Sequence, residues 1–261
     1  MMDNNVLNAI LLSFLAGMST VIGGLIAFIV KKKDYWFLSL CLGFSAGVML
    51  YVSFMEILPD AEKLLFASHN KLYASIIFLS SFLFGILITA LIDKFIPDHL
   101  DADIIKNEVN QLTRFKKVGL LVTLAVAIHN FPEGLATFMS ALNNPTWGIS
   151  IAIAIALHNI PEGISISLPV YYATNSKRKA LFYSFVSGIT EPLGAIIGFI
   201  FLRSFLNNTF FGIIMAFVAG IMIYIALDEL IPLSKEYSND HYSILGVVIG
   251  MFIMAITLII L

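Results

Sequence analysis

A six-residue motif that occurs twice carries the side chains best suited to chemistry in this chain. Residues 129–134 read HNFPEG, and residues 158–163 read HNIPEG. In each copy the histidine and the glutamate are four residues apart, so they share one face of a helix. If the two copies lie on facing antiparallel helices, two imidazoles and two carboxylates surround one point. That donor set suits zinc, and also iron(II), manganese or cobalt.

The motif predicts ligands in two layers. His129 and Glu133 in the first copy, and their equivalents His158 and Glu162 in the second, form a nitrogen-rich position. The asparagine that follows each histidine, Asn130 or Asn159, lies about 100° further around the helix and offers an amide oxygen to a neighbouring position. The two glutamates can bridge both positions, which predicts one histidine-rich and one oxygen-rich metal centre.

Three further side chains are candidate ligands. Glu191 precedes a proline near the middle of an apolar stretch and fits the oxygen-rich centre. Glu56 could line an entrance, with a hydrated helix end as the alternative. Met49, about two turns earlier, could offer a thioether, although packing is the commoner role of such a residue. Asp228 and Glu229 are better explained as a solvated helix end than as ligands.

The composition indicates a membrane protein. Apolar residues make up 59% of the chain and charged residues 12%, and the mean hydropathy is +0.93. A soluble domain carries about twice that charge. The net charge of −2 gives no reason to expect a nucleic-acid partner, and the single cysteine excludes an intrachain disulfide or a thiolate cage. No prosthetic group is expected, and a first segment without Lys or Arg argues against a cleaved signal peptide.

A bilayer span needs about 20 apolar residues, and the chain offers eight such stretches. We therefore expect one all-α transmembrane domain over 1–261, with spans at about 6–30, 36–58, 72–93, 118–141, 148–172, 180–202, 209–232 and 242–261. The long link, about 94–117, is polar. Its cluster of Asp98, His99, Asp101 and Asp103 could collect ions leaving the protein, but a plain solvated loop is the stronger interpretation.

The distribution of basic residues predicts the orientation. Of the 15 Lys and Arg residues, 12 fall in links on one side of the expected bilayer and 3 on the other. Because the basic side is normally cytoplasmic, both termini are expected outside the cytoplasm.

A second repeat relates the two halves of the chain by inversion. Residues 46–51 read AGVMLY and lead to Glu56 and a proline, while residues 219–224 read AGIMIY and lead to Glu229 and a proline at the same offsets. These spans run in opposite directions. The pattern predicts a 3+2+3 arrangement in which spans 6–8 invert spans 1–3 around a central pair, as in many transporters. Chance similarity is the alternative.

The paired motifs, the eight spans and the long link resemble the ZIP (Zrt-, Irt-like) family of divalent metal transporters, and the string at 51–59, YVSFMEILP, resembles its compact bacterial zinc-uptake branch. The resemblance implies uptake of zinc, and often of iron, manganese or cobalt, across a bacterial inner membrane. It also implies a binuclear centre between spans 4 and 5. One site would take His129, Glu133, His158 and Glu162, and the other Asn130, Glu133, Asn159, Glu162 and Glu191.

Two functions other than a carrier are alternatives for this sequence. A metal-selective channel could use the same ligands. An intramembrane metal hydrolase is disfavoured because asparagine follows each histidine, where the HExxH arrangement has a glutamate, so we expect no enzyme activity. The sequence leaves open the preference among metals, the coupling ion and the oligomeric state, and it is compatible with a homodimer.

Overall fold

The computed structural model describes residues 4–29, 35–95, 108–143, 145–202, 207–236 and 241–260, and within them the chain is helical and contains no strand. The elements form eight helical segments, some of which contain a 3₁₀ turn or a π turn. They are α1 (Asn4–Gly24) with the 3₁₀ turn Leu25–Phe28; α2 (Tyr35–Val52), the π turn Ser53–Ile57 and α3 (Leu58–Ser68); α4 (Lys71–Phe95); α5 (Glu108–Asn143); α6 (Pro145–Thr174); α7 (Lys177–Gly188), α8 (Thr190–Ile197) and the π turn Gly198–Leu202; α9 (Asn208–Tyr224), the π turn Ile225–Leu230 and α10 (Ile231–Glu236); and α11 (Tyr242–Ile260).

Each expected span overlaps one of these segments, but two helices run further than the apolar pattern suggests. The second continues through a π turn to Ser68, because α3 buries Ala61 and Leu65 on one face. The fourth, α5, begins at Glu108 and not near 118. Phe115 holds this extension on α6, with its ring centroid 5.3 Å from that of Tyr172.

Seven helices in the described part of the chain are long and apolar enough to cross a membrane. They span Asn5–Gly24, Tyr35–Ser68, Lys71–Lys94, Gly148–Thr174, Lys177–Ile200, Asn208–Glu236 and Tyr242–Ile259. The predicted span at 118–141 lies within the longest helix, α5. The protein is therefore an all-α, multi-pass membrane protein.

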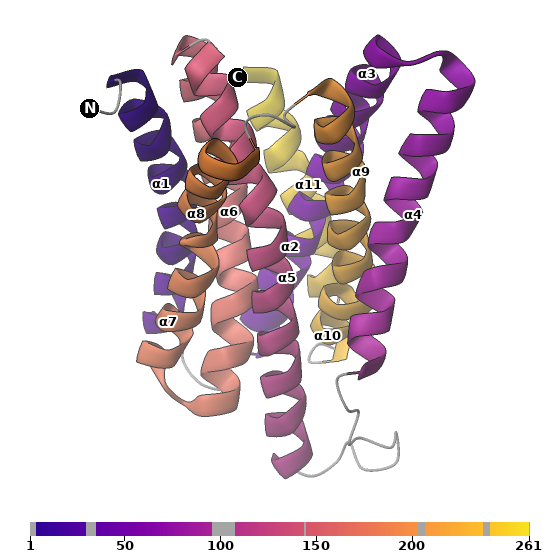
Figure 1. Ribbon diagram of the computed structural model, residues 1–261. Helices are drawn as coiled ribbons and strands as arrows, with labels where there is room; N and C mark the ends of the chain where they lie inside the picture. The colour runs from indigo at the N-terminus through magenta and orange to yellow at the C-terminus, as the bar shows by residue number, and fades with distance from the viewer. Residues whose placement is uncertain are drawn as a thin grey trace.

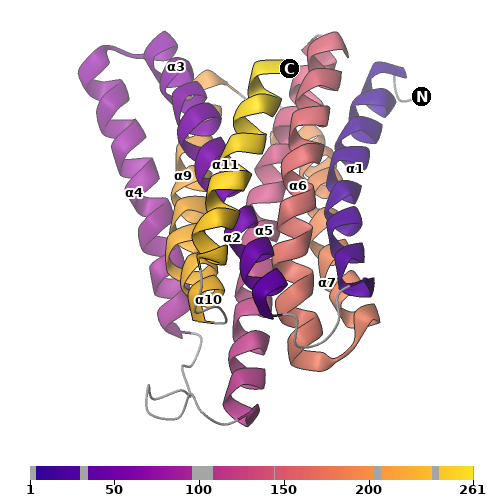
Figure 2. The ribbon, with the colours of Figure 1, turned by 180° about the vertical axis from the view of Figure 1, so that it is seen from behind.

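The helices form two groups. One group contains α1 and α5–α8, and the other contains α2–α4 and α9–α11, as Figures 1 and 2 show from opposite sides. The most extensive packing is inside the groups, between α2 and α11, α1 and α6, α5 and α6, α4 and α9, and α5 and α8. The groups meet mainly where α2 contacts α6 and where α5 contacts α9.

Glycines allow the closest approaches within each group. At these positions a Cβ atom would collide with a backbone carbonyl of the neighbouring helix, so the helices touch through their backbones. The contacts are Gly47 with Val247 (α2–α11), Gly220 with Phe82 (α9–α4), Gly163 with Thr20 (α6–α1) and Gly134 with Glu191 (α5–α8).

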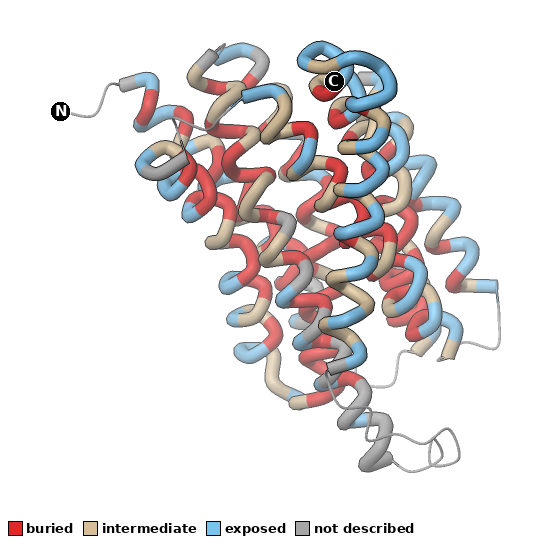
Figure 3. The backbone as a smooth tube through the Cα atoms, turned by 45° about the vertical axis from the view of Figure 1, so that its right-hand side comes forward, coloured by how far each residue is buried: buried red, intermediate tan, exposed pale blue. Residues whose placement is uncertain are grey.

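The bundle has two ends that differ in what they carry. We call the end where α1 begins and α11 ends the terminal end, and the end where α4 ends and α5 begins the loop end (Figure 1). Buried residues face the interior and exposed ones face outward along most helices (Figure 3). The most exposed helix is α4, which packs on α9 and α3 along one side. Its outward side chains include Leu72, Ile76, Leu79, Leu83, Phe84 and Leu87.

Candidate metal centre

The two copies of the motif meet where α5 packs on α6. Both helices continue through the motif prolines, Pro132 and Pro161. His158 Nε2 lies 3.3 Å from Glu133 Oε1, so a histidine of the second copy contacts the glutamate of the first. Both side chains are buried, as is Glu162. The side chain of His129 lies outside the described residues, so its place in the centre remains a prediction.

The two motif asparagines are anchored by backbone carbonyls of neighbouring helices. The Asn159 amide donates to the carbonyl of Ala16 in α1 at 3.0 Å and to Glu191 Oε1 in α8. The Asn130 amide donates to the carbonyl of Ser187 in α7 at 3.4 Å. The structure thus brings Glu191 to the second motif copy, as the sequence predicts. The two carbonyl partners were not predicted, because a backbone group leaves no trace in the sequence.

The buried polar atoms around this point are mostly acceptors. Among the described residues, those without a hydrogen-bond partner include Asn130 Oδ1, Asn159 Oδ1, Glu191 Oε2 and His158 Nδ1. Leaving a buried polar atom unpaired costs about 1–3 kcal/mol, and native proteins leave few of them. A set of unpaired oxygens and an imidazole nitrogen beside buried carboxylates is suited to a cation.

The motif glycines set the distance to the outer helices. A Cβ at Gly134 would collide with the backbone of Glu191, and one at Gly163 with that of Thr20. The hydroxyl of Ser13 donates to the carbonyl of Gly134 at 2.8 Å and secures the same contact from α1. Glycine in the motif therefore lets α8 and α1 lie directly against the helices that carry the polar side chains.

A cavity of about 420 Å³ leads from the terminal end to this point. Glu133 and His158 line its deep part, while Asp60 and the exposed Lys63 line its mouth. Glu56 also lines it, from the π turn before Pro59. Glu56 was predicted from the sequence as an entrance residue, whereas Asp60 and Lys63 were not. Their spacing from Glu56, four and seven positions, placed them on the same helix face and could have identified them.

Met49 lies elsewhere. Its side chain is buried in the apolar cluster between α2, α6 and α9, and it is not among the residues that line the cavity. The structure therefore places it as a packing residue, and a thioether ligand at this position remains untested.

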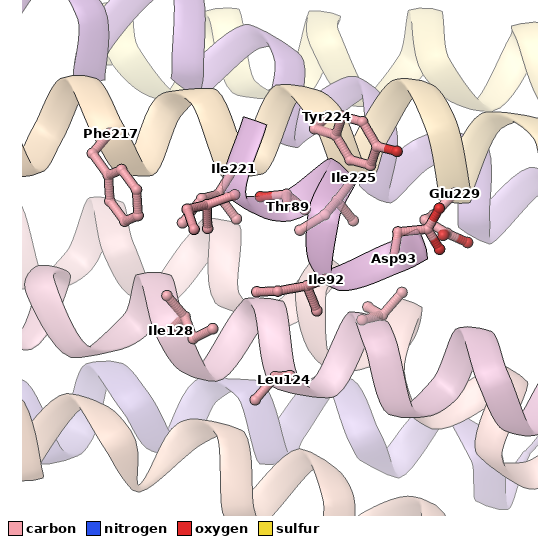
Figure 4. A pocket seen from close by; sticks show the side chains of 12 residues that line it. Thr89, Ile92, Asp93, Leu124, Ile128, Phe217, Ile221, Tyr224, Ile225 and Glu229 are labelled. Atoms are coloured by element: carbon pink, nitrogen blue, oxygen red, sulfur yellow. The ribbon is translucent and has the colours of Figure 1, made fainter. Parts of the chain in front are cut away.

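Acidic residues also gather at the loop end. Oxygens of Asp93, Asp228 and Glu229 lie within 4.8 Å of one another. Figure 4 shows Asp93 and Glu229 side by side at the rim of a small apolar pocket of about 110 Å³. The sequence suggested only a solvated helix end for the last two, because Asp93 comes from a distant helix. The predicted cluster from Asp98 to Asp103 lies outside the described residues.

Comparison with known proteins identifies the family. A model of the ZIP zinc transporter family matches residues 1–93 and 96–258. The chain belongs to the ZIP family. This confirms the resemblance drawn from the paired motifs, and the match covers both helix groups of this ZIP protein.

Several relatives of this ZIP protein align over nearly their whole length. A protein named zinc transporter ZupT from Streptococcus mutans is 50% identical over 260 residues, which are 98% of each chain. Proteins of the same name from Chlorobium chlorochromatii and Lysinibacillus sphaericus are 47% and 48% identical, and cover 98% and 100% of this chain and the same shares of their own. The ZIP protein is thus aligned at both of its motif copies.

Proposed function

We propose that this protein is a carrier that takes up zinc through the cavity between its two helix groups. The observation that carries the proposal is the contact of His158 with Glu133 at the buried end of that cavity. Imidazole and carboxylate are zinc ligands, and the two come from different copies of the motif. The names of the relatives, zinc transporter ZupT, support the same substrate. The function is transport and not catalysis.

We further propose that two metal ions share this point. The nitrogen-rich position would use His129, Glu133, His158 and Glu162, and the oxygen-rich position Asn130, Glu133, Asn159, Glu162 and Glu191. The unpaired amide oxygens of the two asparagines support the second position. Oxygen-rich sites suit harder ions and imidazole suits zinc and iron, so iron(II), manganese and cobalt are proposed as further substrates.

The two halves of the chain are proposed to be inverted repeats. In this repeat α5 is equivalent to α6, and the first three spans are equivalent to the last three. Equivalent contacts in the two halves support it. The hydrogen bond from Asn159 to Ala16 matches the one from Asn130 to Ser187. The hydrogen bond from Ser13 to Gly134 matches the one from Ser184 to Gly163. The close backbone contact of Gly47 with Val247 matches that of Gly220 with Phe82.

The cavity gives the carrier a direction. In the proposed orientation the terminal end faces the outside of the bacterial inner membrane, so the cavity receives ions from outside. At the loop end an apolar cluster fills the space beyond His158, and this supports a carrier over an open channel. Rocking of one helix group against the other would then alternate access, as in other inverted-repeat transporters.

Purified protein in liposomes tests the proposal. Zinc influx is measured for the unchanged protein and for Glu133→Ala and Glu162→Ala, with Glu62→Ala as the matched control because Glu62 is exposed on α3 and does not line the cavity. We expect both motif variants to lose most influx and the control to keep it. Undiminished influx in both motif variants would remove the proposed path. Competition by iron(II), manganese and cobalt then ranks the metals.

A further inference from the structure

The mouth of the cavity holds an ion pair. Lys63 Nζ lies 2.7 Å from Asp60 Oδ1, one helix turn away on α3. Their side chains are 76% and 46% exposed, so both reach solvent while lining the cavity. The other carboxylates that line it, Glu56 and Glu133, lie deeper along the same wall or across from it. An incoming ion therefore meets this pair before it meets the metal centre.

A lysine is an unexpected side chain at this place. The ammonium repels every cation that approaches the mouth, and it occupies the first carboxylate on the path. Exposed ion pairs are weak, however, typically about 0–1 kcal/mol, because solvent screens them. The flexible four-carbon stem of lysine lets the ammonium leave without moving the helix. The pair is thus easily exchanged for another cation.

We propose that Lys63 is a tethered competitor for Asp60, and that the pair selects divalent over monovalent cations at the mouth. This rests on the proposed function, since it assigns a specificity role on the same path. A monovalent ion at Asp60 gains no more Coulomb attraction than the ammonium it displaces, whereas a divalent ion gains twice as much. Competition from the ammonium therefore removes most of the Coulomb attraction that a monovalent ion would gain at Asp60, whereas zinc still gains attraction when it displaces the ammonium.

A further carboxylate lies next on the path of a dication that leaves Asp60. Glu56 lies four residues before Asp60, on the same face of the continuous helix formed by α2, the π turn and α3. A dication released from Asp60 meets Glu56 next, and then Glu133 and His158 in the deep part of the cavity. Asp60 and Lys63 act on entry only, so they set the apparent affinity and not the rate of the later conformational change.

Zinc influx into liposomes, measured against zinc concentration and against added potassium, tests the proposal. Lys63→Met should lower the KM for zinc by about two- to fivefold at low ionic strength, the size expected for one charge within about a Debye length of a dication. The kcat should stay unchanged, and inhibition by potassium should become steeper. Lys63→Arg should keep the unchanged protein's values. Lys71→Met is the matched control, since Lys71 lies at the same end of the bundle, at the start of α4, and does not line the cavity.

The partner carboxylate supplies the second arm. Asp60→Asn should raise the KM for zinc. In that background Lys63→Met should lower the KM by less than in the unchanged protein, because only repulsion by the ammonium is then removed and not its competition for Asp60. Glu62→Gln should behave like the unchanged protein. An unchanged KM in Lys63→Met, or an equal shift in Lys71→Met, would overturn the proposal. Lys63→Gln repeats the test if the methionine variant is poorly folded by gel filtration. Absence of zinc influx in the unchanged protein would instead overturn the proposed function, and this proposal with it.

Discussion

The two ends of the central helix pair differ in what separates the helix groups. At the terminal end, α5 and α6 border a cavity of about 420 Å³. At the loop end the same helices are packed into an apolar cluster that contains Val126, Ile166 and Met222. There the hydroxyl of Ser45 in α2 donates to the carbonyl of Pro161 in α6 at 2.5 Å and joins the two groups directly.

The proposed repeat makes this difference instructive. Ser45 then corresponds to Val218 and Pro161 to Pro132, and the two counterparts line the cavity. Equivalent positions of the two halves are therefore joined by a hydrogen bond in one place, Ser45 with Pro161, and line open space in the other, Val218 with Pro132. In the proposed carrier, access to the metal centre would alternate as these two pairs of positions exchange contact and separation.

The largest effect is expected from filling the open end. Ala136 lines the cavity, and Ala136→Phe adds a ring on the proposed ion path. Zinc influx into liposomes should fall to the level of empty vesicles. Ala67→Phe, at an exposed position on α3, is the control and should keep its influx. Normal influx in Ala136→Phe would mean that ions take another route.

If the two ends open and close by movement of rigid helix groups, the contacts inside each group are kept throughout. Gly163→Ala places a Cβ against the backbone of Thr20, which cannot move aside, and should cost about 1–3 kcal/mol of folding free energy. Thermal unfolding of the detergent-solubilised protein measures this. At Gly119 the nearest atoms are Val170 Cγ2 at 2.8 Å and the Val170 backbone nitrogen at 3.2 Å, so a Cβ there needs a much smaller shift of its neighbour and Gly119→Ala should destabilise less. Equal losses in the two variants would argue against rigid groups.

The hydrogen bond at the packed end should hold that end closed. Ser45→Ala removes a net contribution of about 1 kcal/mol, so the loop end should open about fivefold more often. Cys41, the single cysteine and one turn before Ser45 on α2, is buried and reports the opening through its rate of maleimide labelling. Ser39→Ala is the control, because Ser39 contacts Ser234 within its own group. A labelling rate that is the same in both variants would assign no closing role to Ser45.

The smallest effect is expected at Met49. If this side chain only packs, Met49→Leu conserves its volume and should cost less than about 1.5 kcal/mol of folding free energy. The KM for zinc should not change. A clear rise in that KM, measured in the same liposome assay, would make the thioether a ligand and extend the metal path into the packed cluster.

The sequence is a good guide where local pattern decides structure. Apolar stretches of the right length predict the helical segments, and matched spacing within the motif predicts that Glu133 and His158 approach each other, as they do at 3.3 Å. Burial of ionisable groups in lipid is so costly, about 2.5–3.5 kcal/mol each on insertion scales, that a repeated pair of this kind carries strong information.

The sequence is a poor guide where distant helices decide structure. Asp93 joins Asp228 and Glu229 only because α4 packs on α9. The early start of α5 depends on the contact of Phe115 with Tyr172 in α6. Such contacts depend on packing between segments far apart in the chain, and hydropathy along one segment does not contain them.

The lipid-facing surface of α4 has a consequence for how the chain can change. Apolar residues of many shapes serve equally well where a side chain meets only acyl chains, so Leu79 or Leu83 can drift freely among Leu, Ile, Val and Phe. At the glycine crossings even a single added methyl group meets another backbone. Two stretches of similar hydropathy thus differ in how many substitutions they tolerate. Saturation mutagenesis of this protein should therefore identify the helix contacts inside each group as the intolerant positions.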